Sequence, residues 1–152
     1  MSKRAWTCFG SRAGRKPLGA VEPTGTLPLR NEENIVASRQ MVRQLTQHLK
    51  FSLVDQTKMI TAASELSRNT LVHGGGGQMR WELLDEGIRR GLRLYFEDEG
   101  KGIADLNLAL KDGWTSGGGM GLGLPGSKRL VNEFDIRTAP GEGTCVTITR
   151  WK

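Results

Sequence analysis

Apolar residues recur at helical spacing in two stretches of the N-terminal half of the chain. In the first, from residue 34 to about 50, isoleucine, valine and leucine residues fall on one face and leave polar residues on the other. This pattern predicts an amphipathic helix. In the second, Ser52 followed by Asp55 is typical of a helix start, and a glycine run from residue 74 ends the pattern. We therefore predict a second helix over residues 53–72.

Alternation of apolar and polar residues predicts two hairpins. Residues 79–84 and 91–98 flank a polar turn, and residues 134–138 and 144–151 flank a glycine-rich one. In the predicted strand over residues 91–98, the period of two places Asp98 at the end of a row of core-facing side chains. Shorter segments complete the pattern: an edge strand at 26–29 and helices at 104–111 and 121–132.

The order of these elements is helices, hairpin, helix, hairpin. Strands joined by short turns pair antiparallel, and amphipathic helices must cover an apolar face. We therefore predict an α+β fold of two layers, in which helices cover one face of a mixed, mostly antiparallel sheet. The predicted domain spans residues 26–152.

The formal charge of +6 is concentrated ahead of that domain. Residues 1–22 contain five basic residues and one acid, a net charge of +4, so the rest of the chain carries only +2. Nucleic-acid binding normally needs clustered basic side chains on a structured face, and such a partner is not expected here. Residues 1–25 lack periodicity and are expected to form a disordered basic extension. Because no apolar run could cross a bilayer, we expect a cytoplasmic protein without a membrane partner.

Glu65 and Asn69 are one helical turn apart and project from the same face of the second predicted helix. A carboxylate can accept a hydroxyl proton during phosphoryl transfer. An amide oxygen can join water and phosphate oxygens around Mg²⁺. By itself this spacing is also typical of two solvated helix residues.

Asp98 is a stronger candidate, because a carboxylate that continues a buried strand face needs a hydrogen-bond partner. The exocyclic amine of adenine is one such partner. Gly100 and Gly102 follow it and allow the backbone to approach a flat ligand without Cβ atoms in the way. The alternative is an acid that ends a strand and caps a tight turn.

Five glycines between residues 117 and 123 run into the predicted helix at 121–132. Free backbone N–H groups in such a loop can surround phosphates, and a helix N-terminus favours anions. A dinucleotide-binding fold is not indicated, since no strand precedes the glycines, and the lysine of a P-loop does not follow them. A flexible linker is the alternative.

In this order, the motifs resemble the GHKL superfamily of gyrase-type ATPases, chaperones and histidine kinases. The resemblance rests on Glu65-x-x-x-Asn69, Asp98-x-Gly100-x-Gly102, the glycine run and Gly143-Thr144. Residues 64–69 and 119–130 resemble more narrowly the anti-sigma-factor serine/threonine kinases of bacterial partner switching, especially the stress-response switch kinases. The likeness covers about residues 26–152.

The resemblance implies a Bergerat-type ATP site and a serine/threonine protein kinase, with ATP and Mg²⁺ as cofactors. Asn69 would hold Mg²⁺, Asp98 would read adenine, and Glu65 would be the catalytic base. The residues that it implies in nucleotide binding are Asn69, Asp98, Gly100, Gly102, Gly117, Gly118, Gly119, Met120, Gly121, Leu122, Gly123 and Thr144.

The same resemblance implies a small STAS-domain antagonist protein as the substrate, and a downstream regulator, a phosphatase or a sigma factor, as the alternative partner. A homodimer is compatible with it. Two other readings stay open: a non-catalytic switch whose nucleotide occupancy sets its partner, and a direct anti-sigma factor. One departure concerns the γ-phosphate, because some anti-sigma kinases carry an arginine where this chain has Gly117. Lys101, Lys128 and Arg129 are the candidates to replace it.

Overall fold

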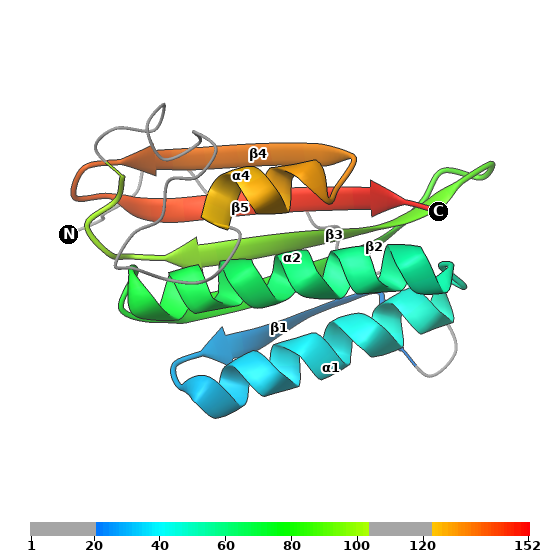
Figure 1. The fold of residues 1–152 in the computed structure, drawn as a ribbon, viewed down its shortest axis with the longest axis horizontal. Helices are drawn as coiled ribbons and strands as arrows, with labels where there is room; N and C mark the ends of the chain where they lie inside the picture. The colour runs from blue at the N-terminus through cyan, green and yellow to red at the C-terminus, as the bar shows by residue number, and fades with distance from the viewer. Residues whose placement is uncertain (1–20, 104–122) are drawn as a thin grey trace.

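Five strands form one sheet in the order β1-β2-β3-β5-β4 (Figure 1). The structure, a computed structural model, describes residues 21–103 and 123–152. The strands are β1 (Thr24–Leu29), β2 (Gly77–Asp85), β3 (Arg90–Asp98), β4 (Glu133–Ala139) and β5 (Gly143–Trp151). The helices of the described residues are α1 (Glu32–His48), α2 (Leu53–Val72) and α4 (Gly123–Arg129). The sheet expected to be mixed and mostly antiparallel has only antiparallel pairings between these strands.

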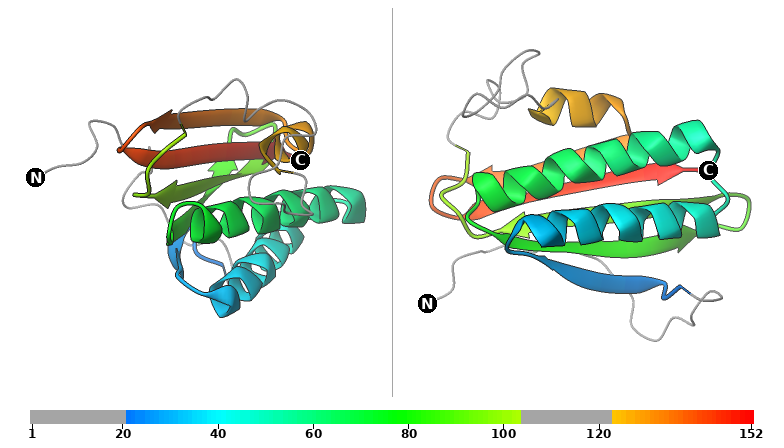
Figure 2. Two further views of the ribbon diagram at one scale, coloured as in Figure 1. Left: turned by 60° about the vertical axis from the view of Figure 1, so that its left-hand side comes forward. Right: turned by 60° about the horizontal axis from the view of Figure 1, so that its bottom comes forward.

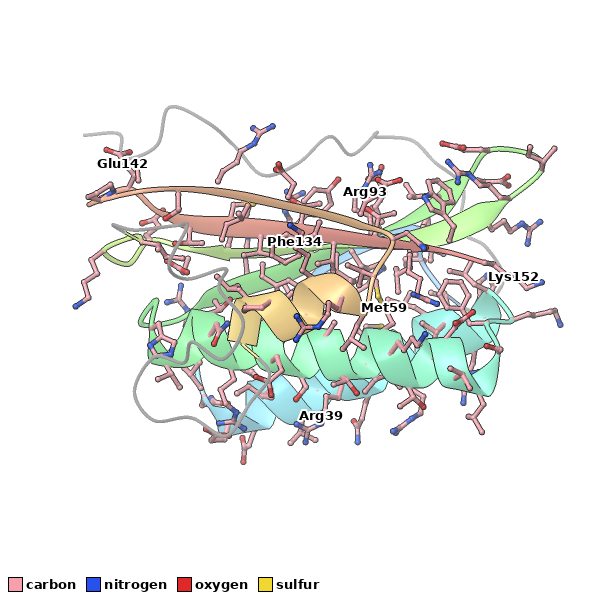
Figure 3. The ribbon with its side chains drawn as sticks, turned by 45° about the horizontal axis from the view of Figure 1, so that its top comes forward. Arg39, Met59, Arg93, Phe134, Glu142 and Lys152 are labelled. Atoms are coloured by element: carbon pink, nitrogen blue, oxygen red, sulfur yellow. The ribbon has the colours of Figure 1, made fainter. Side chains whose placement is uncertain are left out.

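The three described helices lie on one face of the sheet, so the fold has two layers (Figures 1 and 2). This is the α+β architecture predicted from the sequence. Apolar side chains of α1 and α2 fill the space between the layers, among them Val42, Met59 and Leu66. Figure 3 shows Arg39 on the side of the helices that faces away from the sheet.

The start of α2 follows directly from the local sequence. The Ser52 hydroxyl accepts a hydrogen bond from the Asp55 amide at 3.1 Å and thereby satisfies one of the amides that a helix leaves unpaired at its first turn. The helix then runs over residues 53–72, as predicted. α1 begins at Glu32, two residues before the predicted start, because Asn31 caps it by accepting from the Asn34 amide at 2.9 Å.

α4 is shorter at its end than the predicted helix over 121–132. It ends at Arg129, since the chain is then drawn into the sheet layer. The Leu130 carbonyl accepts a hydrogen bond from the Arg150 guanidinium at 2.9 Å, and the Asn132 amide donates to the Thr149 carbonyl. These tertiary bonds replace the next helical turn.

Hydrogen bonds to the sheet begin before residue 26, where the predicted domain starts. The Trp81 indole donates to the Glu22 carbonyl at 3.2 Å, and the Leu83 amide donates to the Pro23 carbonyl at 2.7 Å. Because Pro23 has no amide, it joins the sheet through its carbonyl alone. Residues 22–25 therefore belong to the edge of the sheet and not to the basic extension with which they were grouped.

β3 carries the apolar row that the period of two predicts. Leu92, Leu94 and Phe96 are buried against the helices, and Asp98 at the end of the same face is only 8% exposed. β3 pairs with β2 on one side and β5 on the other. The acid is therefore held at the end of the central strand.

The opposite face of the sheet is polar and carries its own hydrogen-bond network. The Tyr95 hydroxyl donates to Glu82 at 3.0 Å, and Arg80 lies over the Tyr95 ring at 4.5 Å while it pairs with Glu97. Burial, followed by the nearby Glu82 charge, raises the pKa of Tyr95 above its ordinary value. Arg93 projects from this same face (Figure 3).

None of the helices in residues 21–103 and 123–152 has the length and apolar character that crossing a bilayer requires.

Candidate functional site

Three segments that are far apart in the sequence meet at one end of the sheet. They are the C-terminal end of α2, the end of β3 and the start of β5, which lie together in Figure 1. In the strand ladders, Asp98 is aligned with Gly77 of β2 and with Thr144 of β5. The carboxylate predicted to read a ligand is therefore at the meeting point of all three.

Glycines surround the Asp98 side chain closely. A Cβ atom at Gly74, just after α2, would collide with the Asp98 carboxylate, and one at Gly143 would collide with the Asp98 backbone. The Gly100 amide donates to Asp98 Oδ1 at 2.8 Å. The carboxylate is thus fixed by backbone groups that approach it only because they carry no side chains.

The loop after Asp98 is fastened to the β4–β5 hairpin. Gly102 has a φ of +77°, and a Cβ there would collide with the Ala139 carbonyl, so this turn requires glycine. The Gly141 amide donates to the Lys101 carbonyl at 2.7 Å. The Lys101 side chain is exposed, so the loop presents a positive charge to solvent beside the acid.

A pair of threonine hydroxyls lies next to this loop. Thr144 Oγ1 and Thr138 Oγ1 are 2.9 Å apart, and Thr138 also contacts the Ile103 amide at 2.8 Å and the Gly143 carbonyl at 3.0 Å. Thr144 lies opposite Asp98 in the ladder between β3 and β5. Because paired residues of an antiparallel ladder share a face, the threonine hydroxyl and the carboxylate line the same side of the sheet.

Glu65 and Asn69 lie on α2 and are both half-buried. Four residues of α-helix rise by about 6 Å, so one side chain stands a turn above the other. The Asn69 carbonyl accepts from the amides of His73 and Gly74, at 2.9 and 3.2 Å. Asn69 thus lies in the last turn of α2, and its backbone carbonyl is bonded directly to Gly74, the residue that lies against Asp98.

Most of the predicted phosphate loop lies outside the described residues. This applies to Gly117, Gly118, Gly119, Met120, Gly121 and Leu122, and to the predicted helix over 104–111. Gly123, with a φ of +68°, opens α4. Lys128 and Arg129, two of the candidate partners for a γ-phosphate, are exposed in its last turn.

The donor set of the described residues limits which metal site they could form. No group of three or more histidine, cysteine, aspartate or glutamate side chains gathers at metal-binding range within residues 21–103 and 123–152. A lone amide such as Asn69 suits Mg²⁺, which keeps several water and phosphate oxygens as ligands and needs few from the protein.

Sequence reasoning missed two residues of this site. Gly74 was interpreted only as the end of a helix, and Thr138 only as part of a strand. The close approach of Gly74 to Asp98, and the contact of Thr138 with the Ile103 amide, both depend on chain segments distant in the sequence. A glycine after a helix and a threonine near a turn are both too common as patterns to have indicated either role.

Comparison with known proteins identifies the family of this chain. Residues 54–152 match the family model described as histidine kinase-, DNA gyrase B-, and HSP90-like ATPase. The chain belongs to this family. It is the GHKL superfamily that the motifs resemble, and the matched region contains all but the first residue of α2 and all the strands that meet at Asp98.

Curated relatives place the chain within a branch of the GHKL superfamily. It is 42% identical over 120 residues to the serine/threonine-protein kinase RsbT of Bacillus subtilis (strain 168), covering 79% of this chain and 90% of that protein. It is 26% identical over 128 residues to the anti-sigma F factor of Thermoanaerobacter sp. (strain X514), covering 81% and 89%. The predicted class, a serine/threonine protein kinase of the partner-switching type, is confirmed by these relatives.

A solved structure supports the GHKL fold. The RsbU and RsbW domains of Rv1364c from Mycobacterium tuberculosis superpose on this chain with a TM-score of 0.59 at 20% identity. The match covers 86% of this chain but only 32% of that one, so this chain spans about a third of that larger protein. At this identity the likeness concerns the fold alone.

Proposed function

We propose that this GHKL kinase transfers the γ-phosphoryl group of ATP to a serine or threonine of a STAS-domain antagonist protein. It would exchange between that protein and a downstream regulator, a phosphatase or a sigma factor. The observation that carries the proposal is the glycine-enclosed carboxylate of Asp98, 8% exposed at the end of the central strand. The likeness to a serine/threonine-protein kinase gives the reaction class.

In this proposal, the end of the sheet holds the adenine ring. Asp98 accepts a hydrogen bond from the exocyclic amine, with its own geometry maintained by the Gly100 amide. Gly100 and Gly102 hold this turn tightly against Gly74 and the Ala139 carbonyl, and the ring would lie against the backbone beside them. The glycine run from Gly117 to Gly123 covers the phosphates, and its backbone amides donate to their oxygens.

Asn69 is the proposed protein ligand of Mg²⁺, one turn along α2 from Glu65. When bound, the ion would neutralise charge on the β- and γ-phosphate oxygens. The side-chain oxygen of Asn69 would face that ion while its backbone carbonyl ends the helix at Gly74. Asn69 thus links the metal side of the pocket to the adenine side.

Glu65 is the proposed general base. As the oxygen of the acceptor hydroxyl forms its bond to the γ-phosphorus, the hydroxyl proton passes to a Glu65 carboxylate oxygen. The bond between the γ-phosphorus and the bridging oxygen breaks, and ADP leaves with that electron pair. Most of the acceleration comes from holding the reactants in line and from charge stabilisation.

The first test separates chemistry from nucleotide binding. We expect Glu65→Gln to reduce phosphate transfer from labelled ATP to a STAS-domain partner by roughly 10²- to 10⁴-fold, the range typical of a lost general base. Its affinity for Mg·ATP, measured by titration calorimetry, should stay near that of the native chain. Glu33→Gln, at an exposed acid of α1, is the control for both readouts.

Asp98→Asn tests the adenine end of the pocket. Loss of a hydrogen bond to a charged group should weaken ATP binding by roughly tenfold to a hundredfold. Asp85→Asn is a matched control, because Asp85 also ends a strand and accepts from the amide two residues on, Gly87, at 2.9 Å. ATP binding that is unchanged in Asp98→Asn would refute the assigned pocket.

The same assay distinguishes the two alternative functions. Tight, nucleotide-dependent binding of the STAS-domain protein without any phosphate transfer by the native chain would indicate a non-catalytic switch. A stable complex with a sigma factor, formed without the antagonist, would indicate a direct anti-sigma factor. The anti-sigma F factor relative is the reason to include this second measurement.

A further inference from the structure

Thr138 of β4 makes three polar contacts through one oxygen atom. The Ile103 amide donates to its hydroxyl at 2.8 Å, the Gly143 carbonyl lies 3.0 Å away, and the Thr144 hydroxyl lies 2.9 Å away. The residue touches none of the groups proposed to react. It connects the loop after Asp98 with the strand that faces Asp98.

Only one arrangement of hydrogens satisfies all three contacts. A hydroxyl has one hydrogen to donate and two lone pairs that accept. The Ile103 amide can only donate and the Gly143 carbonyl can only accept, so Thr138 accepts from the first and donates its hydrogen to the second. The contact with Thr144 is then satisfied only when the Thr144 hydroxyl donates to Thr138.

The Thr144 hydroxyl consequently presents lone pairs, and no hydrogen, to its other neighbours. Asp98 lies opposite Thr144 in the β3–β5 ladder and is itself an acceptor. The two side chains that line this end of the sheet are therefore both hydrogen-bond acceptors. An amino group or a water molecule, each with two hydrogens, can bridge them, whereas a carbonyl oxygen cannot.

We propose that Thr138 is a positioning residue that holds Thr144 as an acceptor, so that the Asp98–Thr144 pair favours a 6-aminopurine and rejects a 6-oxopurine. This inference rests on the proposed function, in which Asp98 faces the purine. A 6-oxopurine places a carbonyl where the amine would be, and Thr144 has no hydrogen to give it. Without the Thr138 hydroxyl, Thr144 is released to rotate and to donate to that carbonyl.

The test compares Mg·ATP with Mg·ITP, which differ at the 6-position, by titration calorimetry of the full chain. The native protein should bind ATP at least roughly tenfold more tightly, as expected for one unmatched hydrogen bond to a charged group. Thr138→Val should lower this preference by roughly three- to tenfold. Thr138→Ser, which keeps the hydroxyl, should retain it.

The ratio of the two affinities separates positioning from general damage. If Thr138→Val merely loosened the site, the affinities for both nucleotides would fall by a similar factor and their ratio would stay unchanged. Thr144→Val is a second test if Thr138→Val folds poorly. This variant should bind ATP more weakly and ITP nearly as tightly as the native chain. In the double variant, Thr138→Val should cause no further change in the ratio, because its effect passes through Thr144.

The outcomes distinguish failure of the proposed function from failure of the role assigned to Thr138. A native chain that binds neither nucleotide refutes the proposed function together with this inference. A native chain that prefers ATP, with the preference intact in a folded Thr138→Val variant, refutes the role of Thr138 alone. The inference is also overturned if the native chain binds ATP and ITP with equal affinity, or if Thr144→Val weakens the binding of ITP more than that of ATP.

Discussion

At the scale of single residues, the acid at the end of β3 is enclosed by glycines from three separate segments. Gly74 follows α2, Gly100 follows the acid itself, and Gly143 opens β5. A Cβ atom at Gly100 would lie 2.8 Å from the Gly74 Cα, so the backbone of Gly74 leaves no room for a side chain at Gly100. The close packing of backbone around Asp98 therefore depends on the absence of side chains at these glycines.

Gly74→Ala should reduce nucleotide affinity, because its methyl group would occupy the space of the Asp98 carboxylate. Forced displacement of that carboxylate should weaken Mg·ATP binding by roughly tenfold, the loss expected for a hydrogen bond to a charged group. Overpacking should also cost about 1–3 kcal/mol in the free energy of unfolding. Titration calorimetry and urea denaturation measure the two effects separately.

Gly91→Ala is the control for this variant. Gly91 is also crowded, with a Cβ that would meet the Trp151 ring at 2.7 Å, but it lies at the opposite end of β3. A similar loss of stability without a loss of affinity is expected. Equal affinities of Gly74→Ala and the native chain would contradict the assigned position of the carboxylate.

The sequence predicts some of these residues and not others for a physical reason. Asp98 could be placed at the end of a buried strand face because alternation is a local property, and its exposure of 8% agrees. The roles of Gly74 and Thr138 depend on which residues lie opposite them in space. The Ile103 and Thr138 partners are 35 residues apart, so no local pattern contains that contact.

At the scale of elements, α2 is held at both ends by other parts of the fold. Its last turn is joined through Gly74 to the site, and its first turn is joined to β5. Arg150 donates to Asp55 at 2.6 Å and to the Leu130 carbonyl at 2.9 Å, just after α4. One arginine thus connects the start of α2, the end of α4 and the last strand of the sheet.

This connection predicts a pH dependence of stability. The hydrogen bond from Arg150, the largest cause, together with the arginine charge lowers the pKa of Asp55 below its ordinary 3.8. The unfolded chain therefore takes up this proton first as the pH falls. The stabilisation is present above about pH 4 and is lost as the pH falls through the lower pKa of the folded state.

Asp55→Asn should remove that part of the acid dependence. Urea denaturation between pH 7 and pH 2.5 is the measurement, and the variant should show a flatter decline of unfolding free energy on the acid side. Asp135→Asn serves as the control, because Asp135 pairs with Arg137 at the exposed surface of β4 and such pairs contribute little. If the unfolding free energy of Asp55→Asn falls as steeply at low pH as that of the native chain, the assigned effect of the Arg150–Asp55 pair is contradicted.

Element boundaries were predictable where the signal is local. The cap at Ser52 gave the start of α2, because a hydroxyl and an amide three residues on are sufficient to form it. The end of α4 could not be read, since it depends on Arg150 taking the Leu130 carbonyl across the fold. The predicted start at residue 34 missed the first residues of α1 because the acids at its first turn carry no apolar period.

At the scale of the whole molecule, all the described helices lie on one side of the sheet and the site lies at one end (Figure 2). The two hairpins could be predicted because their strands are close in sequence. The pairing of β3 with β5, which brings Thr144 opposite Asp98, joins two separate hairpins. Periodicity could not establish that order, because it is a local property of each strand and does not contain the pairing between hairpins.

A ligand held between separate segments should stabilise the whole fold. At a Mg·ATP concentration a hundred times the Kd, linkage contributes about 2.7 kcal/mol. For a chain of this size that corresponds to a rise in Tm of roughly 5–10 °C. Differential scanning calorimetry should detect this rise in the native chain and in Asp85→Asn, and a much smaller one in Asp98→Asn at the same nucleotide concentration.

The central position of β3 has a consequence for how the molecule opens. Both edges of this strand are bonded, to β2 and to β5, so its amides should take up deuterium only through global unfolding. Like the other inner strands β2 and β5, this strand should be among the slowest to exchange of the described residues, and the carboxylate lies at its end. Nucleotide should slow labelling chiefly in residues 99–103, where the backbone leaves the ladder, and the strand itself should already be protected before the ligand arrives.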